Sequence, residues 1–246
     1  TILVLNKDPK NIKLHINRIK AGCKALKIKN FNPDTLRSHI TKAISDQKNC
    51  ILNINITRGT VKKRGYNINI ENISPNIILT TSKMAKIPKP YNDNGLKTKF
   101  SKTRLFKTIE PLESIKHMNR LTQVLATSEL SKNYPELIMC DEDNNIIEGT
   151  SSNIFFVKGM NFYTPKIHGN SVEGVMRSVI INILKKNKYK INIKKINMKD
   201  IKNYDGAFFC NSIRLIWNIK DLSGYKYKIN NNIQSLIKLV DNEIYK

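Results

Sequence analysis

The spacing of apolar residues in this 246-residue chain changes from a helical period to strict alternation within its first half, and that change limits the fold more than any other feature. A helical period over 12–28, and a second one that begins at Pro33, predict two helices. Alternation at every second residue over 51–57 and over 66–70 predicts two strands, and 76–81 predicts a third. Helices beside an antiparallel sheet make the first half an α+β domain.

The second half interleaves strands and helices after a connection rich in lysine, proline and glycine. That connection runs over 82–115, and we expect a small N-terminal domain over 1–105 and a larger C-terminal domain over 106–246. The order of elements predicts a two-domain chain of the α+β or α/β class. Helices are expected over 119–132, from about residue 173 and over 233–245, and strands over 136–140, 152–157, 161–164, 190–194, 207–210 and 215–219.

The use of cysteine and histidine argues against structural disulfides and metal sites. The four cysteines lie far apart without a CxxC pair, and the four histidines lack the spacing of metal ligands, so we expect a reduced protein without metal. The sequence has no apolar run of membrane-spanning length and no signal-peptide pattern at Thr1, which predicts a cytoplasmic protein without a membrane partner. The cysteines are Cys23, Cys50, Cys140 and Cys210.

The net charge of +24 raises the question of a nucleic-acid partner, because basic surfaces attract polyanions. The lysines, however, alternate with asparagine and isoleucine along the whole chain and do not gather into a basic arm. We therefore expect no nucleic-acid partner, and a basic nucleic-acid-binding protein stays as the alternative from another class. That alternative predicts salt-sensitive binding to any polyanion and no bound chromophore.

Three features in chain order could together hold pyridoxal phosphate. Lys116 could bond to the cofactor aldehyde, and Glu148, at the end of a predicted strand, could face the ring nitrogen. A helix that starts at Gly174 could bind the phosphate through its free backbone amides, and Ser212 could add a hydrogen bond. A lysine amine reacts only when it is neutral, a form that a positive neighbour such as Arg120 favours.

Each of these residues also has a plain structural interpretation. Lys116 by itself could be a solvated lysine at a helix start, Glu148 an edge glutamate of a hairpin, and Ser212 an ordinary turn serine. Arg177 could face outward or brace its own loop. The ordered combination of features, and no single member of it, carries the cofactor hypothesis.

With these motifs the sequence resembles the fold-type IV pyridoxal-phosphate enzymes, the class IV aminotransferase family. The resemblance runs from Thr1 to about Ile219 and implies a D-amino acid aminotransferase-like fold, with a barrel-like sheet in the larger domain, and a homodimer. The motifs that carry it are His15 with Arg18, the hairpin Arg58-Gly59 to Arg64-Gly65-Tyr66, Lys116, Glu148 with Ser152-Asn153-Ile154-Phe155, Gly174-Val175-Met176-Arg177, and Asn211-Ser212.

Within the family, the details resemble the aminodeoxychorismate lyases most closely. The run Lys-His-Met-Asn-Arg-Leu that begins at Lys116 is similar to their bacterial form, and Met176 stands where aminotransferases usually have threonine. The resemblance implies a small-molecule substrate, aminodeoxychorismate, converted to 4-aminobenzoate and pyruvate in folate biosynthesis. A class IV aminotransferase acting on D- or branched-chain amino acids is the alternative, because it shares every cofactor residue.

The resemblance also implies roles for individual residues. Lys116 would be the catalytic lysine that forms the Schiff base, and Glu148 would be the partner of the ring nitrogen. The cofactor-binding set that it implies is Arg18, Lys116, Glu148, Val175, Met176 and Ser212, and the substrate-binding set is Arg104, Arg64 and Asn119.

The family pattern has a further strand region before the position that Thr1 matches, with an Asp-Arg pair and a Gly-Asp-Gly-x-Phe-Glu run. Either the chain was cut or incompletely described, or it is a divergent form, and in a divergent form the small domain would lack that strand and part of the substrate wall.

Overall fold

The chain divides into two compact units, Thr1–Lys86 and Ile87–Lys246. This division falls earlier than the boundary after residue 105 that the composition of the connection suggests, because a short strand before that point already belongs to the sheet of the second unit. The computed structural model describes residues 1–60, 73–84, 94–169 and 171–245.

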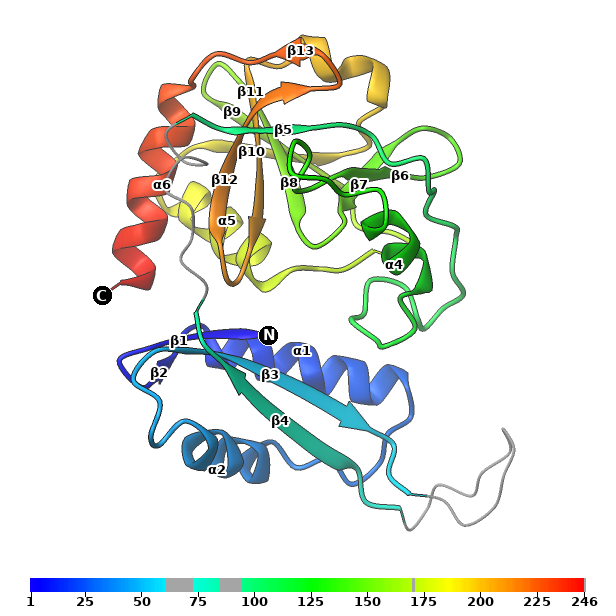
Figure 1. Cartoon of the computed structure of the whole chain (residues 1–246), viewed down its shortest axis with the longest axis vertical. Helices are drawn as coiled ribbons and strands as arrows, with labels where there is room; N and C mark the ends of the chain where they lie inside the picture. Colours follow the sequence, from blue (N-terminus) through cyan, green and yellow to red (C-terminus); the bar gives the residue numbers. More distant parts are fainter. Residues whose placement is uncertain (61–72, 85–93, 170, 246) are drawn as a thin grey trace. The chain divides into compact units, whose positions relative to one another are not determined.

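The first unit is a four-stranded antiparallel sheet with two helices (Figure 1), as the change of period predicts. The side chain of Asn32 accepts hydrogen bonds from two backbone amides of the first turn of α2 and so starts that helix. Arg58 donates to the carbonyls of Leu26 and Lys27, which satisfies the end of α1. The strand order is β2-β1-β3-β4, from β1 (Ile2–Leu5), β2 (Asp8–Pro9), β3 (Cys50–Thr57) and β4 (Asn76–Ser82), with α1 (Ile12–Ala25) and α2 (Pro33–Ala43).

The core of the first unit forms where the helices and the sheet turn apolar faces to one another. The two helices and the strands β3 and β4 confirm the predictions from period, whereas β1 and β2 were not predicted. The strand expected over 66–70 and the substrate residue Arg64 lie outside the described residues. The buried cluster consists of Ile2, Val4, Ile16, Leu36, Ile40, Ile44, Cys50 and Leu52.

The second unit is built on a seven-stranded sheet with the order β10-β9-β8-β11-β12-β13, and β5 pairs in parallel with β12. The strands β6 and β7 form a separate antiparallel pair. No pairing among the described residues closes the larger sheet, so it is open where the resemblance implies a barrel-like sheet. The elements are β5 (Leu96–Thr98), α4 (Leu121–Thr127), β6 (Ile138–Cys140), β7 (Ile146–Gly149), β8 (Asn153–Lys158), β9 (Asn161–Pro165), α5 (Val175–Lys186), β10 (Lys190–Lys194), the 3-10 helix η1 (Met198–Asn203), β11 (Gly206–Asn211), β12 (Leu215–Leu222), β13 (Tyr225–Lys226) and α6 (Asn231–Ile244).

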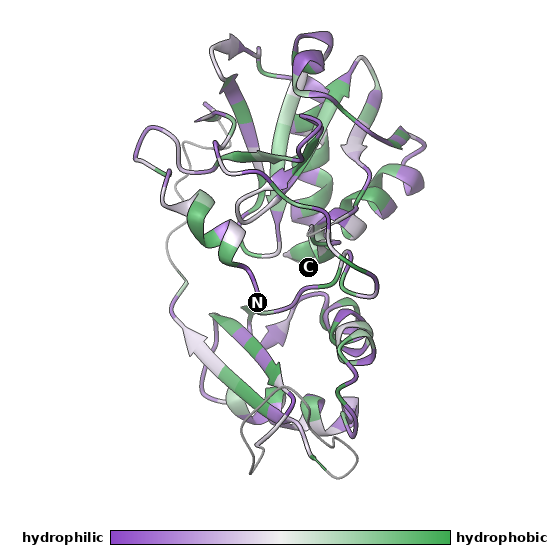
Figure 2. Cartoon of the chain, turned by 90° about the vertical axis from the view of Figure 1, so that its right-hand side faces the viewer, coloured by the Kyte–Doolittle hydropathy of each residue, from purple (hydrophilic) through white to green (hydrophobic). Residues whose placement is uncertain are grey.

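The central strands of this sheet are buried on both faces, which explains their continuous apolar runs. Helices α5 and α6 contact strands of the sheet (Figure 1). Phe155 and Phe208, on neighbouring strands, stack with ring centroids 5.0 Å apart, and the next residues, Phe156 and Phe209, join a cluster around Trp217. Figure 2 shows long green stretches on the strands and helices of this unit, as these burials require.

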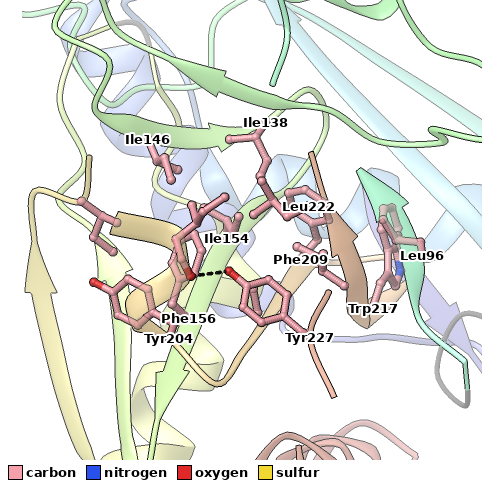
Figure 3. Packing of buried hydrophobic residues seen from close by; sticks show 14 of the residues in the cluster. Leu96, Ile138, Ile146, Ile154, Phe156, Tyr204, Phe209, Trp217, Leu222 and Tyr227 are labelled. Atoms are coloured by element: carbon pink, nitrogen blue, oxygen red, sulfur yellow. Dashed lines mark hydrogen bonds between the residues drawn. The ribbon is translucent and has the colours of Figure 1, made fainter. Parts of the chain in front are cut away.

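The cluster around Trp217 joins the sheet to the β6–β7 pair and to η1. Burying these side chains stabilises the unit by roughly 1.5–3 kcal/mol for each large residue. The Tyr227 hydroxyl donates to the carbonyl of Ile201 at 2.9 Å, so its polar end is satisfied within the cluster (Figure 3). The buried members are Leu96, Ile138, Cys140, Ile146, Ile154, Phe156, Ile196, Ile201, Tyr204, Ala207, Phe209, Trp217, Ile219, Leu222 and Tyr227.

The helices and strands predicted for the second half are confirmed, with one change of length. The helix expected over 119–132 covers only Leu121–Thr127, and its Leu121, Val124 and Leu125 are exposed. The short elements β5, β13 and η1 were not predicted. No helix among the described residues is both long and apolar enough to cross a membrane.

Candidate active site

Glu148 lies near the end of β7 and is a buried carboxylate with a strongly shifted pKa. Its side chain is 5% exposed, and its Oε2 accepts a hydrogen bond from the amide of Val172 at 2.9 Å. Burial raises the pKa of Glu148 to about 7, although that hydrogen bond and the positive charges of Arg120 and Lys116 lower it. A carboxylate held in this way is ready to pair with a further positive group.

The loop that carries Lys116 is fixed beside this carboxylate. The Arg120 guanidinium donates to the carbonyls of Ile115 and His117, and so folds the loop around itself. Arg120 and Lys116 are close enough to Glu148 to act on its pKa. Lys116 is exposed, which leaves its side chain accessible to a ligand. The predicted lysine and the predicted carboxylate therefore lie close enough to interact.

The start of α5 is held to the same loop and to the same carboxylate. The amide of Glu173 donates to the carbonyl of Ser114 at 3.2 Å, next to the lysine loop. The amide of Val172 goes to Glu148, and its carbonyl accepts from Asn153 Nδ2 at 2.9 Å. These contacts bring the helix start beside the lysine loop, although the two are far apart in the sequence.

Gly174 is the N-cap of α5 and has no side chain to satisfy the helix amides. A side chain at this position would collide with the Asn153 carboxamide, so glycine lets Asn153 keep its place beside the helix start. The first amides of a helix have no partner within it, and their partial positive charge favours an anion. Val175 and Met176, which provide these amides, are buried.

Ser212 lies in the tight turn between β11 and β12. The Oδ1 of Asn211 accepts hydrogen bonds from the amides of Ile213 and Arg214 at 3.0 and 2.9 Å, and this arrangement shapes the turn around Ser212. The Nδ2 of Asn211 donates to the carbonyl of Ser151 at 3.3 Å. The turn is thus connected to the loop that follows Glu148.

Arg177 and Arg104 lie outside this group of contacts. Arg177 is buried and donates to the Thr164 hydroxyl and the Pro165 carbonyl, so it braces a loop, one of the two interpretations that the sequence allows. Arg104 donates to Asn144 Oδ1 at 3.0 Å, in the turn between β6 and β7, while its second terminal nitrogen is buried without a hydrogen bond among the described residues.

The remaining predicted residues are Arg18 in the first unit and Asn119 in the second. Arg18 is partly buried on α1 in the first unit, where burial lowers its pKa. The neighbouring His15 is buried, and this burial, with the charges of Arg18 and of the chain's first amine, lowers its pKa to about 3. Asn119 is exposed just before α4.

Sequence reasoning missed Gln123 and Glu136, and it gave Arg120 only the role of a positive neighbour of Lys116. Gln123 helps to lower the pKa of Glu148 by a hydrogen bond, and Arg120 acts on the carboxylate as well as on the lysine loop. Glu136 is buried and accepts hydrogen bonds from the loop after Glu148. The helical spacing of Arg120 and Gln123 behind Lys116 was a usable signal, whereas nothing near Glu136 in the sequence singles it out.

Comparison with known proteins shows which family the chain belongs to. The family model Amino-transferase class IV matches residues 1–222. An aminodeoxychorismate lyase of Vibrio harveyi is 26% identical over 227 residues, which cover 91% of this chain and 82% of the relative. The crystal structure of 4-amino-4-deoxychorismate lyase from Pseudomonas aeruginosa has a TM-score of 0.92 at 26% identity and covers 98% of this chain and 88% of that one.

A branched-chain amino acid aminotransferase from Escherichia coli shares the fold, with a TM-score of 0.84 at 18% identity, covering 98% of this chain and 82% of that one. The fold and the site define a fold-type IV enzyme. Because the family model spans most of its length, the chain belongs to the class IV aminotransferase family. That family depends on pyridoxal phosphate.

The chemistry of the donor set fits that cofactor. Pyridoxal phosphate presents an aldehyde, a basic ring nitrogen and a phosphate dianion. The second unit brings together an exposed lysine, a buried carboxylate and a helix start without a side-chain cap. The described residues contain no cluster of histidine, cysteine and carboxylates that could hold a metal ion instead.

Proposed function

We propose that this enzyme is a pyridoxal phosphate-dependent lyase that converts 4-amino-4-deoxychorismate to 4-aminobenzoate and pyruvate. The observation that carries the proposal is the linked group of Lys116, Glu148 and the α5 start within a chain that resembles an aminodeoxychorismate lyase over 91% of its length. The same linked group would also suit an aminotransferase, so the choice of reaction rests on the relative.

The cofactor would be held by the residues that the resemblance implies. Lys116 would bind the aldehyde carbon and Glu148 the ring nitrogen, and the backbone amides of Val175 and Met176 would donate hydrogen bonds to the phosphate, with Ser212 as a further donor. Arg18 is the arginine that the resemblance implies for the phosphate. When bound, the cofactor supplies an electron sink for the substrate carbon next to the nitrogen. The buried Glu148, with its pKa of about 7, would become fully ionised beside a protonated ring nitrogen.

Lys116 would move the protons of the reaction. In its free amine form, Lys116 would take the proton from the amine-bearing ring carbon of the substrate. The bond between the neighbouring ring carbon and the enolpyruvyl oxygen then breaks, and the ring becomes aromatic. Lys116 returns the proton to the methylene carbon of the enolpyruvate, which gives pyruvate. All atoms of the substrate are thus recovered in the two products.

The substrate is a dianion, and arginine is suited to its carboxylates. We assign Arg104 to one of them, because its guanidinium has a buried nitrogen with no hydrogen bond to a described residue. Arg64 and Asn119 are the further substrate contacts that we propose from the resemblance. The high positive charge of the chain would attract such a substrate over long range.

We also propose that the enzyme is a homodimer in the cytoplasm. The segment from Phe106 to Leu125 exposes several large apolar side chains, and such a surface favours burial in an interface. The four cysteines are free thiols, which agrees with a reducing compartment. The exposed members of that segment are Phe106, Ile109, Met118, Leu121, Val124 and Leu125.

One assay tests the reaction. Purified enzyme should release 4-aminobenzoate and pyruvate in equal amounts from aminodeoxychorismate without any keto acid. A lyase leaves the cofactor in its aldehyde form, whereas an aminotransferase converts it to the amine and needs a keto acid to return. An enzyme that makes no 4-aminobenzoate, but loses its colour with a D- or branched-chain amino acid and recovers it with a keto acid, is an aminotransferase instead.

A further inference from the structure

Glu136 is a buried carboxylate that no step of the proposed reaction uses. Its side chain is 2% exposed and lies just before β6. One oxygen accepts from the Ser151 amide at 2.7 Å and from the Ser152 hydroxyl at 2.9 Å, and the other accepts from the Ser151 hydroxyl at 2.8 Å. Burying a carboxylate is costly unless donors replace its hydration, and these three donors come from the loop that follows Glu148.

That loop closes tightly around the carboxylate. Gly149, directly after Glu148, lies so near that a side-chain carbon at this position would be 2.5 Å from Glu136 Oε1. The Gly149 amide donates to the Ser152 carbonyl at 2.7 Å, and the Thr150 amide donates to the Leu137 carbonyl at 3.0 Å. The conformation of the loop, and with it the end of β7, therefore depends on Glu136.

The same loop reaches the turn that carries Ser212. The Ser151 carbonyl accepts from Asn211 Nδ2 at 3.3 Å, and Asn211 Oδ1 receives the amides of Ile213 and Arg214. Only Ser151 separates the Glu136 carboxylate from Asn211 in this chain of contacts. Two pieces of the proposed cofactor site thus meet at one loop.

We infer that Glu136 is a positioning residue, which fixes the Gly149–Ser152 loop and so sets the Glu148 carboxylate and the Ser212 turn in the geometry that pyridoxal phosphate needs. The inference rests on the proposed cofactor site and adds a residue that touches neither cofactor nor substrate. It requires cofactor binding but not a particular reaction.

Glu129 provides a matched control within the same unit. It also holds a loop by accepting several hydrogen bonds, among them those from the Ser101 hydroxyl at 2.8 Å and the Lys102 amide at 2.8 Å. That loop is tied to Ile138 by the amide of Ser101, and its described hydrogen bonds do not involve the Glu148 loop. Loss of Glu129 should therefore cost stability without moving the cofactor residues.

The experiment compares the purified full-length variants Glu136→Ala, Glu136→Gln and Glu129→Ala. Each cofactor-free protein is titrated with pyridoxal phosphate, and the pH dependence of the cofactor's visible absorption and the thermal midpoint are recorded. Both alanine variants should unfold at lower temperature. Glu136→Ala alone should bind the cofactor about 10-fold or more weakly, because the Gly149–Ser152 loop relaxes. The pH at which the cofactor's visible absorption changes should also shift in this variant. Glu136→Gln keeps an acceptor oxygen for two donors and should restore affinity to within about 3-fold.

Equal affinity and an unchanged absorption profile in Glu136→Ala, as in Glu129→Ala, would overturn the inference. If Glu136→Ala does not fold, the exposed Ser151→Ala decides the matter. It removes one donor to Glu136 and should weaken cofactor binding by about 3-fold or more, and wild-type affinity would overturn the inference. A wild-type enzyme that binds pyridoxal phosphate but makes no 4-aminobenzoate refutes the lyase reaction alone, and the variants still decide the role of Glu136.

Discussion

The carboxylates of Glu129 and Glu148 lie in the same unit but in opposite environments. Glu129 accepts hydrogen bonds from Ser101, Lys102 and Thr103 at 2.8–3.1 Å. Burial raises its pKa, but these hydrogen bonds outweigh burial and lower the pKa to about 2. Burial dominates at Glu148, where the one described backbone donor and nearby positive charges leave the pKa raised to about 7.

This difference separates a structural carboxylate from one that is kept for a ligand. Glu129 has its partners within the fold, and its ionised form stabilises the Ser101–Thr103 loop. Glu148 is buried at a cost that its described partners only partly offset, and a cationic ring nitrogen would complete the compensation. We therefore expect substitutions near Glu148 to affect cofactor and turnover, and those near Glu129 to affect stability.

The largest effect should come from Lys116. Lys116→Ala removes the group that we propose to bind the cofactor and carry the protons, and turnover should fall by ~1000-fold or more. Borohydride should fix pyridoxal phosphate onto Lys116 in the wild type and not in the variant, as peptide mass spectrometry would show. Lys132→Ala, at an exposed position, is the control and should behave as the wild type. The reduced adduct on another lysine would refute the assignment.

The next effect should come from Glu148. Glu148→Gln keeps the shape and the acceptor for Val172 but removes the charge, so turnover should fall by ~100-fold or more while cofactor binding suffers less. Steady-state kinetics and a cofactor titration measure the two effects separately. The control Glu129→Gln should turn over normally. Unchanged turnover in Glu148→Gln would mean that Glu148, like Glu129, has only a structural role.

Arg104 tests whether residues near the Glu129 loop affect only stability. It directly follows that loop in the chain, but we assign it to the substrate. Arg104→Ala should lower kcat/KM on aminodeoxychorismate by about 10- to 100-fold, as loss of a charged contact to a carboxylate predicts. The visible absorption of the cofactor should not change. If only the thermal midpoint falls, Arg104 is a brace for Asn144 and belongs with the structural region.

The sequence was most informative where a pattern is long or a motif is local. The helices α1 and α5 and the strand β3 were predicted from period and are confirmed. The order of Lys116 and Glu148 in the chain led to the cofactor hypothesis, and their roles stay a prediction. The strands β2 and β5 were missed because two or three residues cannot display an alternation. Their pairing is a property of the folded sheet.

The parts of the site that the sequence did not predict depend on tertiary contacts. Glu136 reaches the Glu148 loop only through the pairing of β6 with β7, and nothing local distinguishes it from a surface glutamate. Arg120 looked like a charge for the lysine alone, yet it also holds the lysine loop through Ile115 and His117. Burial produces the shifted pKa of Glu148. The local sequence, a short strand that ends at a turn, does not reveal that burial.

The smallest effect that we predict is a difference in how the two carboxylates change stability with pH. The raised pKa of Glu148 favours its protonated form in the folded protein, so its contribution is fully present below about pH 4.5 and is lost as the pH rises towards 7. The lowered pKa of Glu129 does the reverse: its contribution is present above about pH 4.5 and is lost as the pH falls towards 2.

Urea unfolding of the cofactor-free protein between pH 3 and pH 8 can separate these contributions, since each carboxylate has a glutamine variant. Glu148→Gln should match the wild type at pH 4 and exceed it by about 2 kcal/mol at pH 8, because the amide has no charge to bury. Glu129→Gln should be less stable than the wild type at pH 8 and approach it near pH 3. If Glu148→Gln is the less stable protein at pH 8, the described partners already compensate the buried charge, and Glu148 is as structural as Glu129.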